Sequence, residues 1–88
     1  MSYSVFWAPH AEQRLEEILC DRGAQAQLAA AAIEIDQRLI SNPLRFGESR
    51  FDAVRVGFVR PLGVQYEVLD DARAVIVYDV WRIDVKST

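Results

Sequence analysis

Residues 54–83 read VRVGFVRPLGVQYEVLDDARAVIVYDVWRI. This stretch decides the fold, because apolar and polar residues alternate through its first half with the period of two that is typical of β-strands. The letters PLG at 61–63 and DDAR at 70–73 interrupt the pattern with turn signals. The nearly continuous apolar run over 74–83 indicates a strand in the interior of a sheet. We therefore predict three strands joined by short turns as an antiparallel meander.

The chain before this meander predicts one strand and two helices. Aromatic and β-branched residues over 2–7 favour a first strand. Apolar residues then recur at helical spacing in two segments, 8–23 and 24–42, and Asn42-Pro43 ends the second. The stripes are Ala11, Leu15, Ile18 and Leu19 in the first helix, and Leu28, Ala32, Ile35 and Leu39 in the second, widened by Ala29, Ile33 and Ile40.

These elements predict an α+β fold of order β-α-α-β-β-β. The helical hairpin packs on one face of a small, mostly antiparallel, four-stranded sheet, and residues 1–88 form one domain. Val64, Tyr66 and Val68 are expected to face the helices. The opposite face of the sheet, which no helix covers, is called the uncovered face below.

Composition excludes several classes of protein. The 88 residues contain one cysteine and one histidine, so we expect no internal disulfide, no metal site with the usual four ligands, and no cofactor. The N-terminus lacks the pattern of a signal peptide, and LAAAAIEI at 28–35 is too short to span a bilayer. We therefore expect a cytoplasmic protein that does not associate with membranes.

The distribution of charge is uneven. The net charge is −3 and the pI is about 5.0, which argues against a domain devoted to nucleic-acid binding. Residues 44–66 nevertheless carry four basic and two acidic side chains, and the basic ones follow each other at intervals of five: Arg45, Arg50, Arg55 and Arg60. A local basic patch therefore remains open.

Arg55 can be interpreted in two ways. If the helices cover Val54, Val56 and Phe58, Arg55 lies on the uncovered face together with Gln65 and Glu67. It would then be either part of a solvated face, in an Arg55–Glu67 ion pair worth at most about 1 kcal/mol, or part of a patch that contacts phosphate.

Other residues favour ordinary structural roles. His10 is expected at the surface and Cys20 in the core. Tyr78 and Trp81 could stack on nucleic-acid bases, although packing in a core or interface is the commoner role of such side chains.

The order of these motifs resembles the RelE/ParE superfamily of toxins from type II toxin–antitoxin systems, also described as the plasmid stabilisation family. The resemblance rests on a strand ending in WAPHAE, a helical hairpin ending in LISNPLRFGES, and the Arg-bearing, V-x-Y-x-V and Val/Ile-rich strands of 54–83. It covers nearly the whole chain and implies the same fold.

The resemblance implies two alternative activities. RelE-like members are ribosome-dependent endoribonucleases that inhibit translation by cleaving mRNA; this is the first hypothesis, with Arg55 and Arg82 as catalytic residues and Arg45, Arg50 and Arg60 binding the RNA backbone. ParE-like members inhibit DNA gyrase without any nuclease activity. A third alternative is a degenerate, non-toxic binding module. The implied partners are a cognate antitoxin and either the ribosome with mRNA or DNA gyrase. A homodimer is a further alternative.

Three features depart from the nuclease pattern; the first two favour the ParE-like alternative, and Gly63 with the acidic surface also permits the degenerate one. Gly63 replaces an arginine that often precedes V-x-Y in the family and acts in catalysis in the nucleases. No Tyr or His follows Arg82 to serve as a terminal acid or base. The acidic net charge also differs from that of ribosome-dependent nucleases, which tend to be basic.

Overall fold

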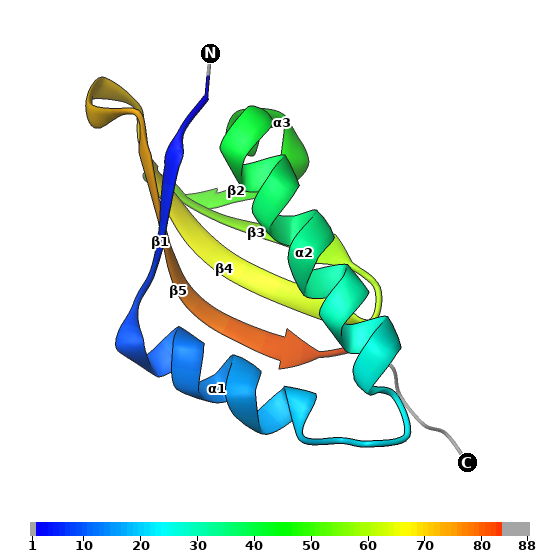
Figure 1. Ribbon diagram of the computed structural model, residues 1–88. Coiled ribbons are helices and arrows are strands. Elements are labelled where there is room, and N and C mark those ends of the chain that lie inside the picture. The colour runs from blue at the N-terminus through cyan, green and yellow to red at the C-terminus, as the bar shows by residue number, and fades with distance from the viewer. Residues whose placement is uncertain (1, 84–88) are drawn as a thin grey trace.

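The alternating stretch forms three antiparallel strands in the computed structural model, which describes residues 2–83 (Figure 1). They are β3 (Val54–Val59), β4 (Leu62–Leu69) and β5 (Ala74–Arg82), with the 3-10 turn η1 (Asp70–Ala72) between the last two. The predicted meander is confirmed.

Two further strands extend the sheet at its edges. β1 (Ser4–Trp7) pairs in parallel with β5, and β2 (Glu48–Phe51) pairs antiparallel with β3, which gives the order β1-β5-β4-β3-β2. The α+β class and the interior position of β5 are confirmed. The sheet of residues 2–83 has five strands rather than the predicted four, because β2 forms where the sequence predicts no strand. All four β2 side chains are exposed, so its sequence carries no apolar face that marks a strand.

Three helices lie on one side of the sheet. α1 (Pro9–Leu19) packs along β5, and α2 (Gln25–Ser41) crosses the same face (Figure 1). Pro9 occupies the first turn of α1, where its missing N–H is not needed, and the alanines of α2 favour a helix intrinsically. Asn42 leaves the helical conformation, and a short helix α3 (Pro43–Phe46) follows it. Among residues 2–83, no helix is both long and apolar enough to cross a membrane.

The core lies between the helices and the sheet. Val64, Tyr66 and Val68 are buried in it, as predicted. Its buried residues are Ala11, Leu28, Ala31, Ile35, Leu39, Leu62, Val64, Tyr66, Val68, Val75, Val77 and Val80. The expected widening of the α2 stripe is wrong for Ile33 and Ile40, and Cys20 is exposed rather than part of the core.

The face assigned to Arg55 from the sequence is also wrong. Arg55 lies opposite the buried Tyr66, and Gly57 lies opposite Val64, so both face the helices. The reason is steric: a Cβ on Gly57 would come within 2.5 Å of the Phe46 ring, so the absence of a side chain lets α3 approach the strand. Val54, Val56 and Phe58 therefore lie on the uncovered face.

Candidate functional site

Arg55 connects β3 to the α3 segment. Its Nη2 donates to the carbonyl of Leu44 at 2.7 Å and to the carbonyl of Gly47 at 2.8 Å, while its Nε is buried and has no partner among the described residues. The predicted Arg55–Glu67 pair does not form, because Arg55 and Glu67 lie on opposite faces. Arg55 acts here as a structural link between strand and helix.

Tyr66 reinforces this connection from β4. Its hydroxyl donates to the carbonyl of Pro43 at 2.6 Å and accepts from the N–H of Gly47 at 2.9 Å, and both bonds are buried. Its ring stacks on Phe46 with 5.9 Å between the centroids. Burial raises the pKa of Tyr66 above 10.0, although the Gly47 N–H and Arg55 act in the opposite direction. The structural role expected for Tyr66 agrees with these contacts.

Arg82 lies at the other end of the sheet. It is opposite Leu62, and its Nη1 donates to Oδ2 of Asp21 at 2.6 Å, beyond the end of α1. This arginine and the Gly23 N–H lower the pKa of the Asp21 carboxyl below its ordinary 3.8. Arg55 and Arg82 are opposite β4 residues four positions apart, about 13 Å along the strand. The structure therefore does not bring the two predicted catalytic arginines together.

The other three predicted arginines divide between the same two ends. Arg45 lies in α3, and Arg50 lies at the irregularity between β2 and β3, in the corner that also contains Arg55. Arg60 precedes Pro61, whose carbonyl accepts from the N–H of Ile83, so it lies at the end that contains Arg82. All three side chains are exposed. Because they lie at two separate ends of the sheet, they do not form one continuous basic surface with Arg55 and Arg82.

The uncovered face is aromatic and acidic. Trp81 lies over Gly63 and meets the ring of Phe58 edge-on at 6.4 Å between centroids. The hydroxyl of Tyr78 donates to Glu67 at 2.7 Å, and this bond raises the pKa of Tyr78. No Lys or Arg occurs at the following positions of this face in β3, β4 and β5: Val54, Val56, Phe58, Gly63, Gln65, Glu67, Leu69, Ala74, Ile76, Tyr78 and Trp81.

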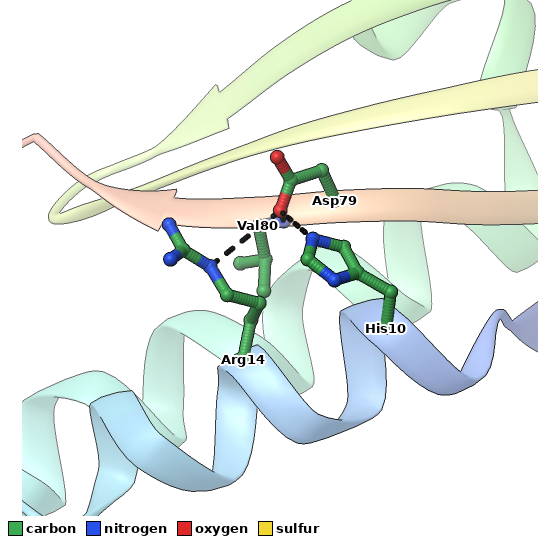
Figure 2. Close-up of polar contacts among 4 residues, drawn as sticks. All are labelled: His10, Arg14, Asp79 and Val80. Carbon is green, nitrogen blue, oxygen red and sulfur yellow. Dashed lines mark hydrogen bonds and ion pairs between the residues drawn. The ribbon is translucent and has the colours of Figure 1, made fainter.

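A polar cluster between α1 and β5 was not foreseen from the sequence. Asp79 Oδ1 lies 3.4 Å from Nε2 of His10 and 3.7 Å from Nε of Arg14, and it accepts the N–H of Val80 at 2.8 Å (Figure 2). His10 is exposed, as predicted. Its partner lies 69 residues away in the chain, so only the α1–β5 packing could have identified the pair.

The surroundings of this cluster do not favour an anionic substrate. A neighbouring pocket of about 330 Å³ is lined by Arg14, Glu17, Ile18, Asp21 and Arg82. The carboxylates of the pocket match its guanidinium groups in number, and Asp79 adds a further negative charge. The cluster is therefore best described as a polar connection that fixes α1 to β5. Within residues 2–83, no group of three or more His, Cys, Asp or Glu could hold a metal ion.

Comparison with solved structures identifies the fold. The RelBE2 toxin–antitoxin complex of Mycobacterium tuberculosis contains a chain that is 19% identical and superposes with a TM-score of 0.79, over 93% of this chain and 99% of that one. The isolated RelE toxin of E. coli is 16% identical with a TM-score of 0.64, over 97% and 88% of the two chains. The ParDE system of P. aeruginosa gives 18% identity and a TM-score of 0.65, over 93% and 97%.

No protein-family model and no curated protein sequence matches the chain. The similarity to these structures is one of fold, at identities that leave most side chains different. It nevertheless extends over nearly the whole of each chain. The protein thus has the fold of the RelE/ParE superfamily of toxins, as the order of its sequence motifs predicted.

Proposed function

We propose that this protein is the toxin of a type II toxin–antitoxin pair, and that it acts by binding a protein target, as ParE-like toxins bind DNA gyrase, without cleaving mRNA. The toxin role is supported by the fold shared with chains of the RelBE2, RelE and ParDE structures. Two solved structures with this fold are complexes of toxin and antitoxin, which supports an antitoxin as the partner here.

The choice between the two mechanisms rests on the bonding partners and the separation of the two predicted catalytic arginines. Arg55 donates hydrogen bonds to backbone carbonyls under α3, and Arg82 is paired with Asp21 at the opposite end of the sheet. A nuclease needs cations that converge on one phosphate, and loss of a single transition-state contact of this kind typically costs a factor of about 10² to 10³.

The uncovered face supports the same choice. Its strand positions offer no cation to a phosphate backbone and Glu67 would repel one, whereas aromatic residues are enriched where proteins bind proteins. Gly63 removes the arginine of the nuclease pattern, and Trp81 occupies the space above it. A His that could transfer a proton is not available on this face either. The one His of the sequence, His10, lies on α1 and contacts Asp79 of β5.

A pair of variants distinguishes the two mechanisms. Arg82→Gln removes the cation that a nuclease would need, and Asp21→Asn weakens the same ion pair while retaining that cation. We expect both variants to stay folded and as toxic as the parent when expressed in bacteria. Loss of toxicity in Arg82→Gln alone, with Asp21→Asn still toxic, would show that the cation itself is required and would overturn the proposal.

The target is tested in the same cultures. After induction of the chain alone, we expect growth to stop, gyrase–DNA complexes to accumulate, and mRNA to keep its normal 5′ ends. Early new 5′ ends inside coding regions would instead establish the nuclease. Unimpaired growth at full expression would contradict a toxin role altogether.

A further inference from the structure

The junction of α2 and α3 carries an open surface pocket of about 280 Å³ that plays no part in the function proposed above. Five residues line it: Arg38, Ser41, Asn42, Arg45 and Phe46. Arg38, Ser41, Asn42 and Arg45 follow each other at the spacing of one helical face. Asn42 interrupts that face, with φ −155° and ψ 61°, and separates the last turn of α2 from α3. Because the helix is interrupted at Asn42, the pocket opens between Arg38 and Arg45.

The aromatic wall of this pocket is fixed by the core. Phe46 stacks on the buried Tyr66, and the guanidinium of Arg38 lies 5.8 Å from the centroid of the Phe46 ring. The N–H groups of Arg45 and Phe46 both bond to the carbonyl of Asn42, at 3.2 and 3.1 Å. The backbone of the pocket is therefore held before any ligand arrives, which lowers the entropic cost of binding.

The charges around the pocket leave a positive excess. Arg38 directs Nε and Nη2 to Oε2 of Glu34, at 3.1 and 2.9 Å, so its Nη1 is not used by that pair. Arg45 has no hydrogen bond or ion pair from its side chain within residues 2–83. Arg55, behind α3, donates to the carbonyls of Leu44 and Gly47. The two guanidinium groups that line the pocket, those of Arg38 and Arg45, thus have one paired carboxylate between them, in a protein whose net charge is −3.

The pocket suits a single small anionic group with some apolar surface. Guanidinium groups match the geometry of a carboxylate, the Asn42 amide can donate or accept, and Phe46 offers a face for methylene groups. A polynucleotide would extend beyond the pocket towards Glu34 and the acidic remainder of the protein, which disfavours it. We propose that the α2–α3 pocket binds an Asp or Glu side chain of a partner polypeptide. This inference does not depend on the toxin being a gyrase inhibitor.

The test is a titration of ¹⁵N-labelled protein with two capped tripeptides, acetyl-Ala-Glu-Ala-amide and its Gln counterpart. We expect saturable shifts of the amides over residues 38–47 with the Glu peptide only. Arg45→Gln should weaken this binding about tenfold, which corresponds to loss of one hydrogen-bonded charge pair. The control is Arg22→Gln, which alters an exposed arginine in the α1–α2 turn and should leave the affinity unchanged.

Three results would overturn the assignment. Equal shifts with the Gln peptide would show that the carboxylate is not recognised. Equal affinity in Arg45→Gln would show that the shifts arise elsewhere. Tighter binding of a hexauridylate to the same amides, lost in Arg45→Gln, would assign the pocket to nucleic acid instead.

Discussion

Tyr66 and Arg55 show how single residues fix an irregular segment to a regular sheet. The backbone between Pro43 and Gly47 turns too tightly to satisfy all its polar groups internally, and these two side chains bond to it from β4 and β3. Buried polar groups are costly when left without partners. The two residues therefore stabilise the segment that also forms the α2–α3 pocket.

Tyr66→Phe should destabilise the protein markedly. The change removes one hydroxyl and leaves the buried Pro43 carbonyl and Gly47 N–H without their partner. We expect the free energy of unfolding, measured by urea denaturation, to fall by about 2 to 4 kcal/mol. Tyr78→Phe is the control, because its bond to Glu67 is exposed, and should change stability by no more than about 0.5 kcal/mol. Equal effects of the two changes would contradict the role given to Tyr66.

The same hydroxyl predicts a dependence on alkaline pH. Since burial raises the pKa of Tyr66 in the folded protein, the unfolded chain loses this proton first, near pH 10.0. The stabilisation is complete below that pH and is lost as pH rises through the folded-state pKa. Tyr66→Phe should therefore lose stability less steeply above pH 10 in thermal unfolding. Some slope should remain, because the pKa values of Tyr3 and Tyr78 are also raised. Identical slopes would exclude Tyr66 as the cause.

At the scale of elements, the position of the Trp81 indole over β4 depends on a missing side chain. Gly63 lies opposite Trp81, and a Cβ at position 63 would come within 2.7 Å of the indole. The indole covers the glycine and contacts Phe58 across the sheet. Position 63 thus carries an aromatic cover in place of a cation, so a substitution at this position alone would meet the indole.

A double-mutant cycle tests this coupling. Gly63→Ala should lower the free energy of unfolding by about 1 to 3 kcal/mol through overpacking. In the Trp81→Ala background the same change should cost at least about 1 kcal/mol less. Gly23→Ala is the matched control, since its new Cβ would meet only Asp21 Oδ1 at an ordinary 3.5 Å. Additive effects at positions 63 and 81 would show that the indole does not restrict position 63.

The elements also show what the sequence could and could not predict. The period of two identified β3 and β4, and the continuous apolar run identified β5. The period also assigned Val64, Tyr66 and Val68 correctly, because polar residues alternate with them. It failed for β3, where both faces carry apolar residues and only the contact of Gly57 with Phe46 decides between them. The pairing of His10 with Asp79 and the α2–α3 pocket depend on contacts between elements, which spacing along the chain does not contain.

At the scale of the whole molecule, the sheet is strongest at its centre. β4 and β5 carry most of the buried strand residues, whereas every β2 side chain is exposed. β1 adds Val5 and Trp7 to the core from the far edge. Stability should therefore decrease from β4 and β5 towards β2.

Hydrogen exchange followed by NMR measures this gradient directly. We expect the amides bonded between β4 and β5 to exchange only through global unfolding, and those of β2 to exchange through local opening. Mild denaturant should accelerate exchange in β4 and β5 strongly and in β2 hardly at all. Equal denaturant dependence in β2 and β5 would mean that the sheet opens as one unit.

The order of the sheet has a consequence for biosynthesis. β5 lies between β1 and β4, although it is the last of the five strands to leave the ribosome. Until residue 82 has emerged, β1 has no strand to pair with. One edge of β4 also lacks its hydrogen-bonding partner. A nascent chain at that stage exposes unpaired strand edges, which invite aggregation or capture by a chaperone. The finished sheet, and any surface built on it, can therefore form only after β5 has left the ribosome.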